Sequence, residues 1–211
     1  MTVSDAERVL LVQHDLDPEF ERIVRDDKVV AWDIETSGLD PRLDTIALCQ
    51  LFTPRAGTRI VQVQQGIPER LRELLISDRV MKVFHHAAFD LRFMRYHWKA
   101  VAHNVACTKI LSKITHPEVE SIEHSLKSVA TRYLGVELDK GQRLSDWSRS
   151  DLTPEQLSYA ARDVQFLLPL FERLMEEARF NGVSDLVERT FSYLPTRVET
   201  DLRGCGDVFA Y

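Results

Sequence analysis

The chain has 211 residues, with 27 lysines and arginines against 33 aspartates and glutamates, and its formal net charge is −6. This balance argues against a protein that coats long nucleic acid, since such proteins usually carry a basic excess, but it leaves room for a small anionic ligand. The sequence shows neither an apolar run long enough to span a bilayer nor a secretory signal, and its three cysteines are far apart, which disfavours a zinc site or a disulfide framework. We therefore expect a cytoplasmic protein with no membrane partner.

Alternating β-forming runs and turns predict most of the first 85 residues. The strand at 29–34 ends at Ser37 and Gly38, and the short separations after it predict an antiparallel meander. In chain order we expect a strand at 9–12, a helix at 17–25, strands at 29–34, 44–52 and 59–63, a helix at 68–76 and a strand at 80–85.

Helices dominate the rest of the chain. Thr153, Pro154 and Gln156 form a strong helix start, with a capping residue, a proline at the first helical position and a capping box. Pro169 lies inside the apolar run that follows and should kink or split the helix, which ends at Gly182. We also expect helices up to Tyr96, at 109–114, from Ser121 to Gly135 and at 183–194, a strand at 104–108, an irregular segment at 140–150 and a tail at 195–211.

This order of elements predicts an α/β or α+β layered fold with a mixed sheet flanked by helices. We expect a single domain over 1–211, with a core at about 27–175 and a C-terminal helix and tail at 183–211. The strand with Asp33 should be central.

Two carboxylates mark that strand. Side chains alternate along a strand, so Asp33 and Glu35 share one face, while Trp32 and Ile34 share the other. Neighbouring carboxylates raise each other's pKa, and burial adds a desolvation cost that a cation between them would remove. Taken alone, an Asp-x-Glu at a strand end is more often simply solvated.

Three further side chains extend this pair. Asp90 lies at the start of a helix, and Tyr159 and Asp163, four residues apart, share a face of the best-capped helix. Each has an ordinary structural explanation, because an early helical Asp stabilises the helix N-terminus and Tyr159 could be a buried aromatic. Together, however, they are the parts of a two-metal phosphodiesterase, in which carboxylates hold two Mg²⁺ or Mn²⁺ ions and Tyr159 orients the attacking water.

Basic side chains gather around the lone acid of one stretch. Residues 79–116 contain seven lysines or arginines and five histidines, and Asp90 is their only acid. This pattern fits a solvated helix face or a phosphate-attracting rim about equally well.

Three segments resemble the exonuclease motifs of the DEDD superfamily: Asp33-Ile34-Glu35, Phe84 to Asp90, and Tyr159-Ala160-Ala161-Arg162-Asp163. Their order and separations also fit. The Tyr-x-x-x-Asp motif marks the tyrosine subclass, since the histidine subclass would place His where Ser158 stands. Within it the chain is similar to the ribonuclease D group, including at 133–140 and 145–147, and the resemblance covers roughly residues 27–175.

The resemblance implies a ribonuclease H-like fold and roles for individual residues. Four carboxylates would hold two divalent metal ions, Mg²⁺ or Mn²⁺, and Tyr159 would orient the water. Thr36, Gly38 and Leu39 would lie against the 3′ nucleotide, with Leu39 wedged between bases. His85 and Phe89 are further candidates for substrate contact, although Phe89 could equally pack in the core, and Trp147 is expected to pack. The four implied metal ligands are Asp33, Glu35, Asp90 and Asp163.

The C-terminal segments 191–197 and 207–211, and the stretch 107–110, resemble nanoRNase C, a compact branch that degrades very short RNAs. Ser37 and the pair His86-Ala87 are residues that this branch need not share. The branch implies a ring-like homo-octamer. The apolar end 208–211 could bury in a neighbouring subunit or cap its own core. We expect no room for the additional helical nucleic-acid-binding domains of full ribonuclease D.

We therefore predict a metal-dependent 3′-5′ exoribonuclease that hydrolyses dinucleotides and other short RNAs to nucleoside 5′-monophosphates. One alternative is an enzyme that trims longer, structured RNA 3′ ends or acts on DNA. Another is a non-catalytic nucleic-acid-binding scaffold, although such proteins have usually lost a carboxylate and this chain keeps all four.

Overall fold

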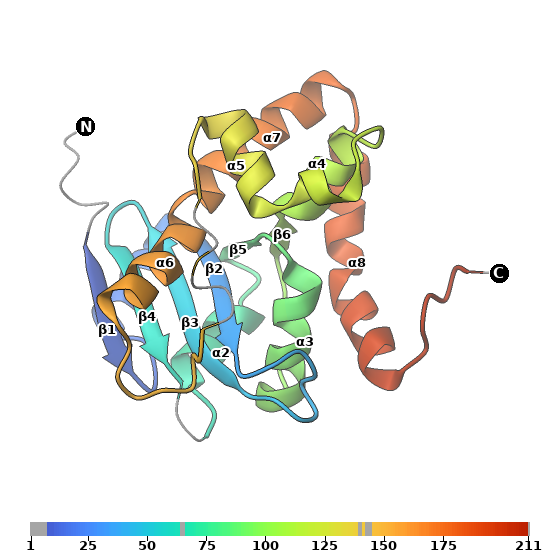
Figure 1. Ribbon diagram of the computed structural model, residues 1–211. Helices are drawn as coiled ribbons and strands as arrows, with labels where there is room; N and C mark the ends of the chain where they lie inside the picture. The colour runs from blue at the N-terminus through green and yellow to red at the C-terminus, as the bar shows by residue number, and fades with distance from the viewer. Residues whose placement is uncertain (1–7, 64–65, 139–140, 142–144, 211) are drawn as a thin grey trace.

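The computed structural model describes residues 8–63, 66–138, 141 and 145–210. Figure 1 shows one sheet with helices on both of its faces. In chain order the elements are β1 (Val9–Gln13), α1 (Pro18–Asp27), β2 (Val29–Thr36), β3 (Ile46–Thr53), β4 (Gly57–Gln62), α2 (Glu69–Ile76), β5 (Met81–Phe84), α3 (Ala87–Trp98), β6 (Val105–Cys107), α4 (Thr108–Thr115), η1 (Ser121–His124), α5 (Leu126–Leu134), α6 (Pro154–Gln165), α7 (Leu167–Phe180) and α8 (Ser184–Arg203).

The six strands form a mixed sheet in the order β1-β4-β3-β2-β5-β6. The predicted meander is confirmed, because β2, β3 and β4 pair antiparallel. The other pairs, β1 with β4, β2 with β5 and β5 with β6, are parallel. β2 is an inner strand, as predicted, and it pairs with β3 on one side and β5 on the other.

The two faces of the sheet carry different cores. On one face Trp32 of β2 is fully buried and stacks on Phe84, with ring centroids 5.9 Å apart. Phe20 of α1, Leu71 of α2 and Trp98 of α3 belong to the same cluster. On the other face α6 lies over β4, β3 and β2 and α7 packs against β2 and β5, and the two helices cover smaller clusters (Figure 1). Asp33 and Glu35 point to this second face.

The predicted start of α6 is confirmed in detail. Thr153 Oγ1 accepts from the Gln156 backbone, and the Gln156 side chain accepts from the Thr153 backbone. The apolar run after it splits into two helices at Phe166, so that Pro169 falls in the first turn of α7, where its missing N–H costs no helical hydrogen bond.

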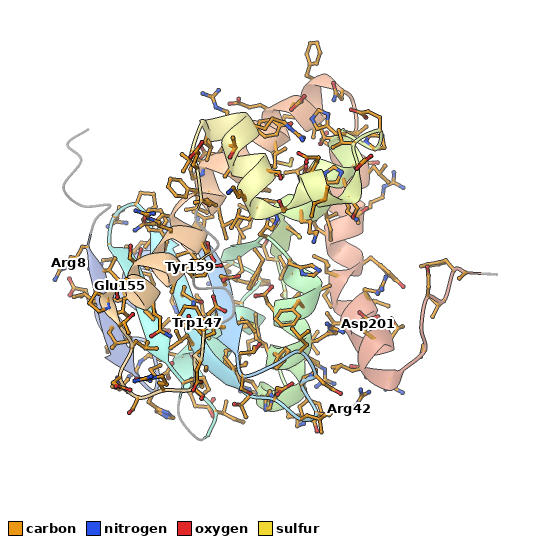
Figure 2. The ribbon with its side chains drawn as sticks, viewed as in Figure 1. Arg8, Arg42, Trp147, Glu155, Tyr159 and Asp201 are labelled. Carbon is orange, nitrogen blue, oxygen red and sulfur yellow. The ribbon has the colours of Figure 1, made fainter. Side chains whose placement is uncertain are left out.

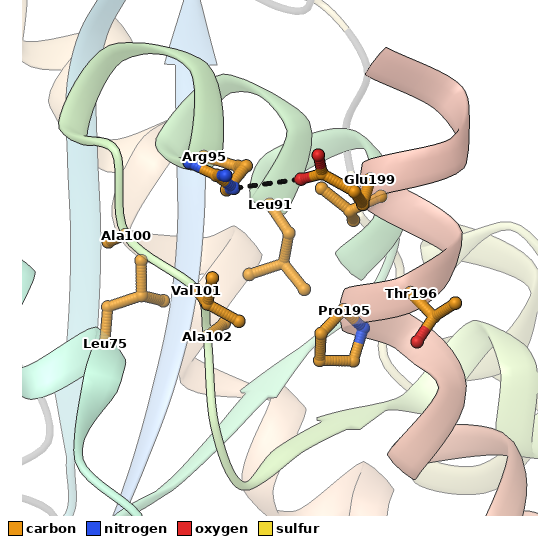
Figure 3. A pocket seen from close by; sticks show the side chains of 10 residues that line it. Leu75, Leu91, Arg95, Ala100, Val101, Ala102, Pro195, Thr196 and Glu199 are labelled. Atoms are coloured by element: carbon orange, nitrogen blue, oxygen red, sulfur yellow. Dashed lines mark hydrogen bonds and ion pairs between the residues drawn. The ribbon is translucent and has the colours of Figure 1, made fainter. Parts of the chain in front are cut away.

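The end of the last helix was predicted wrongly. α8 continues through Pro195 to Arg203, where a tail was expected. Packing explains the difference, because Leu194 and Val198, on either side of the proline, are buried against α3 and the neighbouring core. Figure 3 shows Pro195 lining an apolar pocket of about 280 Å³ between α3 and α8, beside an Arg95–Glu199 ion pair of 3.2 Å.

The helix expected from Ser121 is two elements, since the 3₁₀ turn η1 precedes α5, and α5 ends at Gly135 as predicted. The irregular segment at 140–150 lies partly outside the described residues, and its described part has no helix or strand. None of the described helices has the length and apolarity needed to cross a membrane.

Candidate active site

β2 brings the first two carboxylates together. Asp33 and Glu35 are half-buried near the end of this strand, opposite Gln50 and Leu48 of β3. The register shifts between Glu35 and Thr36, so the strand leaves the regular ladder directly after the second carboxylate. Such irregularities re-aim side chains at the edge of a site.

β5 and α3 supply the third carboxylate. β5 runs parallel to β2, so the carboxyl ends of the two strands lie at the same edge of the sheet. α3 begins just beyond that edge, and Asp90, in its first turn, is only 2% exposed. Its carboxylate is hydrogen-bonded to the Ile34 backbone, which joins the first turn of α3 directly to β2.

α6 supplies the remaining two side chains from across the sheet face. Tyr159 and Asp163 share one side of this helix, as predicted, and the Tyr159 hydroxyl donates a hydrogen bond to Asp163. The Tyr159 ring packs on Trp147, with centroids 5.9 Å apart. Figure 2 shows both rings on the side of the sheet that α6 covers. Trp147 is 3% exposed, so the expectation that it packs is confirmed.

These carboxylates meet closely enough to bind cations. Oxygens of Asp33, Glu35 and Asp163 lie within 4.8 Å of one another. Asp90 stands slightly apart from these three, but its charge acts on Asp33 and Glu35. The structure thus brings together all five residues that the sequence predicted for the catalytic centre.

The electrostatics of the cluster are unfavourable without a counter-charge. Burial, together with the Asp163 and Asp90 carboxylates, raises the pKa of Glu35 to about 9. Burial and the other three carboxylates raise the pKa of Asp33 well above its usual range. Burial also raises the pKa of Asp90 and of Asp163 to about 7, against the opposing effect of their hydrogen bonds. Hard divalent cations such as Mg²⁺ and Mn²⁺ prefer this all-oxygen donor set.

The turn after β2 holds three of the predicted substrate-contact residues. The Thr36 hydroxyl donates to the Gly38 carbonyl at 2.6 Å, and a side chain at position 38 would collide with the Asp44 carboxylate. That carboxylate accepts from the Asp40 backbone, which closes the turn. Leu39 projects from the turn and is 79% exposed. The turn that follows Asp33 and Glu35 along the chain therefore presents an exposed apolar side chain.

Unlike the exposed Leu39, His85 is buried and Phe89 is half-buried. His85 is buried, and its ring nitrogens contact the Thr108 hydroxyl at 2.9 Å and the His124 carbonyl at 3.1 Å. Burial lowers the pKa of His85 to about 3, so the ring is neutral and ties β5 to α4. Phe89 is half-buried against the core, and its ring centroid lies 5.1 Å from that of Phe93. Their predicted contact with substrate stays a prediction.

Part of the predicted basic stretch gathers around His86, four residues before Asp90. His86, at the start of α3, has its pKa lowered to about 4 by burial and by Lys109, Arg92 and Lys113. We call these four residues the basic cluster. Among the residues that the structure describes, Arg92, Lys109 and Lys113 make no ion pair with an acid. Arg92, Lys109 and Lys113 therefore supply the positive charge of this cluster, while His86 is neutral at pH 7.

Two residues near the site were not predicted. Arg162 lines a pocket of about 370 Å³ together with Tyr159 and Asp163, and its position inside the Tyr-to-Asp motif was the available signal. Gln50 is fully buried opposite Asp33. Its signal in the sequence was a single amide in the otherwise apolar run of β3.

Comparison with known proteins agrees with this geometry. A family model described as a 3′-5′ exonuclease matches residues 12–179. The chain therefore belongs to the 3′-5′ exonuclease family. Ribonuclease D of Zymomonas mobilis is 34% identical over 139 residues, which are 65% of this chain and 35% of that protein, so the matched part spans about a third of that relative.

Solved structures extend the likeness over nearly the whole chain. NrnC from Brucella melitensis matches with a TM-score of 0.89 and 33% identity, covering 96% of this chain and 98% of that one. The same protein has been solved with Mg²⁺ and with pGG. Escherichia coli RNase D, at 22% identity and a TM-score of 0.77, covers 90% of this chain and 50% of its own length, and supports the fold alone. The ribonuclease H-like fold predicted from the sequence is thus confirmed.

Proposed function

We propose that the protein is a metal-dependent 3′-5′ exoribonuclease that hydrolyses very short RNAs, dinucleotides above all, to nucleoside 5′-monophosphates. The observation that carries the proposal is the convergence of Asp33, Glu35, Asp90 and Asp163 with Tyr159 at one edge of the sheet. One buried and three half-buried carboxylates held this close together are costly unless cations neutralise them.

Two divalent ions, Mg²⁺ or Mn²⁺, fit this donor set, with the four carboxylates as ligands. Such a pair supplies a hydroxide nucleophile at neutral pH and neutralises the leaving oxygen. The chain's own part is to hold the ligands on three rigid elements, β2, α3 and α6, so that little reorganisation is needed when the ions bind.

Tyr159 would orient the attacking water. Burial and the Asp163 and Glu35 carboxylates raise the pKa of its phenol above the ordinary value, so the hydroxyl keeps its proton. Because that proton is donated to Asp163, the phenol oxygen has lone pairs free to accept from a water. The Tyr159 ring is held in place by Trp147.

The turn at 36–39 would receive the 3′ nucleotide. We propose that Leu39 wedges between the two bases, that Thr36 and Gly38 line the terminal sugar, and that His85 shapes this part of the site through Thr108 while Phe89 borders it. An exposed leucine on a closed turn supports the wedge, because its apolar surface is otherwise unpaired with the core.

Two observations favour very short RNA over long RNA. The likeness to NrnC covers almost all of both chains, and one of the NrnC structures holds the short ligand pGG. In addition, the basic cluster is small and begins at His86, four residues before Asp90 at the start of α3, which suits a ligand with few phosphates rather than a long strand. We further propose a cytoplasmic homo-octamer built from single-domain subunits, on the resemblance to nanoRNase C.

One observation favours a second candidate function. The curated relatives, such as the Zymomonas mobilis protein, are ribonucleases D, and the Escherichia coli RNase D with the same fold is described as an exoribonuclease of structured RNA processing. Trimming of longer RNA 3′ ends is therefore the alternative. A DNA substrate is a variant of it, since DNA polymerase I of Aquifex aeolicus is also similar, at 32% identity over 148 residues.

The two candidates differ in how rate depends on length. RNAs of two, three, five and twenty nucleotides with a 5′ label, and a DNA dinucleotide, are incubated with the full-length protein and Mn²⁺ or Mg²⁺, and with EDTA. We expect the RNA dinucleotide to be cleared at least tenfold faster than the 20-mer, and no product in EDTA. Similar rates at all lengths would replace the proposal by the trimming function.

A matched pair of variants tests the basic cluster in the same assay. Lys109→Gln with Lys113→Gln should lower the dinucleotide rate and weaken its dependence on salt, because two phosphate-attracting charges are lost. Arg22→Gln is the control and should leave the rate unchanged, because Arg22 is an exposed residue of α1, which packs on the face of the sheet away from the carboxylates.

A further inference from the structure

Gln50 is the least satisfied side chain that the structure describes. It lies in β3 with no exposed surface, and neither its Nε2 nor its Oε1 has a hydrogen-bond partner. No other described side chain has two such buried, unpaired atoms. A buried polar group without a partner destabilises a protein, so a glutamine at this position calls for a physical reason.

Its neighbours are mostly apolar. Along β3 on the same face lie Leu48 and Phe52, and Ile60 of β4 is opposite on one side. Leu48 and Ile60 pack with Ala160 and Ala161 of α6, which cover this part of the sheet. An apolar side chain of similar volume would fit such surroundings better than an amide.

Asp33 is the exception among these neighbours. It is paired directly with Gln50 in the antiparallel ladder between β2 and β3. Directly opposed residues have Cβ atoms about 4.5–5.5 Å apart on the same face, within the reach of a glutamine side chain. A carboxylate has only acceptors and an amide nitrogen has two donors, so the two groups are chemically complementary.

We propose that Gln50 is a positioning residue for the metal site. When cations bind, its Nε2 donates a hydrogen bond to the Asp33 carboxylate and so fixes which oxygen of Asp33 faces the ions. The assignment rests on the proposed function, since it requires that Asp33 is a metal ligand. Partners behind the ligands commonly orient them in this way, and their loss typically lowers metal affinity by about 10–100-fold.

The test compares Gln50→Met with Phe52→Leu in the full-length protein. Methionine keeps the length and approximate volume of glutamine but cannot donate, whereas Phe52→Leu disturbs packing two residues away on the same face, opposite Ala31. Mn²⁺ affinity is measured by titration calorimetry without substrate, and the unfolding temperature is measured in EDTA.

We expect Gln50→Met to weaken Mn²⁺ binding by about 10–100-fold while the metal-free unfolding temperature stays equal or rises, because an unpaired amide has been removed. Phe52→Leu should show the reverse, with a lower unfolding temperature and unchanged Mn²⁺ affinity. Unchanged affinity in Gln50→Met, with the wild type binding Mn²⁺, overturns the role of Gln50 alone. If the wild type itself takes up no Mn²⁺, the proposed function fails, and the role of Gln50 fails with it.

A second measurement needs no variant and holds even if Gln50→Met does not fold. In a crystal structure of the wild-type protein with Mn²⁺, Gln50 Nε2 should lie about 2.7–3.2 Å from an Asp33 oxygen. A separation too long for a hydrogen bond, with the ions in place on Asp33, would overturn the proposal.

Discussion

The two faces of β2 differ sharply in the side chains that surround them. On one face Trp32 and Ile34 are almost completely buried, and Trp32 stacks on Phe84 and packs near Trp98. On the other face, one residue along, Asp33 and Glu35 lie among further carboxylates whose charges repel them. Because side chains alternate along β2, one face of the strand stabilises the folded protein and the other destabilises it.

This difference shows how the fold accommodates a costly site. The carboxylates are placed on an inner strand, where its neighbours on both sides and the core behind it hold the backbone in register. The apolar face contributes stability that the acidic face opposes. Substitutions on the apolar face should therefore lower the stability of the fold, whereas substitutions on the acidic face should lower the rate of hydrolysis.

The largest effect is expected from the acidic face. Asp33→Asn removes a proposed metal ligand, and we expect nucleoside 5′-monophosphate release from an RNA dinucleotide to fall by about 10³-fold or more, which equals about 4 kcal/mol of activation free energy. In EDTA the same variant should unfold at a higher temperature than the wild type, because one repelling charge is gone. If Asp33→Asn kept the wild-type turnover, Asp33 would not be a metal ligand.

The apolar face should respond in the opposite way. Trp32→Ala deletes a fully buried ring, and we expect the free energy of unfolding in urea to fall by about 3–5 kcal/mol. Below its unfolding transition the variant should keep kcat within a few-fold of the wild type. If Trp32→Ala lost activity while its stability was unchanged, the separation of the two faces would be wrong.

Tyr159→Phe tests the carboxylate site on the acidic face of β2 without changing the charge of that site. The ring keeps its packing on Trp147 while the hydroxyl that we propose orients the water is lost, so we expect kcat to fall by about 10²-fold with little change in KM. Tyr133→Phe is the matched control, since that hydroxyl bonds to Glu177 on α7, outside the site. Equal effects of the two substitutions would count against a role in catalysis.

The last prediction is a pH dependence of stability. The pKa of Glu35 is raised from 4.5 to about 9, so between these values the folded protein holds a proton that the unfolded chain releases. Folding is then favoured at low pH, and this contribution is lost as the pH rises toward 9. Glu35→Gln cannot titrate, so in EDTA its unfolding temperature minus that of the wild type should grow from pH 5 to pH 9.

The control for this last experiment is saturating Mn²⁺. The ions should stabilise the wild type more than Glu35→Gln and so reduce or reverse the difference at pH 8. A difference between the two proteins that stays constant from pH 5 to pH 9 in EDTA would contradict the shifted pKa.

The separation of the two faces of β2, and much of the candidate site, could be predicted from the sequence with local rules. The period of two along β2 separated Asp33 from Trp32, and the spacing of four along α6 put Tyr159 with Asp163. The split near Pro169 followed from the chemistry of proline. These features depend on residues close together in sequence, so one chain was enough to predict them.

Features that depend on packing between distant segments were harder to predict. A proline usually ends a helix, and only contacts of α8 with α3 explain why α8 continues through Pro195. His85 bonds to Thr108 and His124, a pairing that no spacing rule indicates. Gln50 faces Asp33 only because of the register between β2 and β3.

Anomalous diffraction from Mn²⁺-soaked crystals of the wild-type protein tests most directly whether the acidic face of β2 is a two-metal hydrolytic site. We predict two peaks roughly 3.5–4 Å apart among Asp33, Glu35, Asp90 and Asp163, both absent in Asp33→Asn. Well-ordered carboxylates with no Mn²⁺ peak between them at saturating metal, or peaks only elsewhere, would contradict the account.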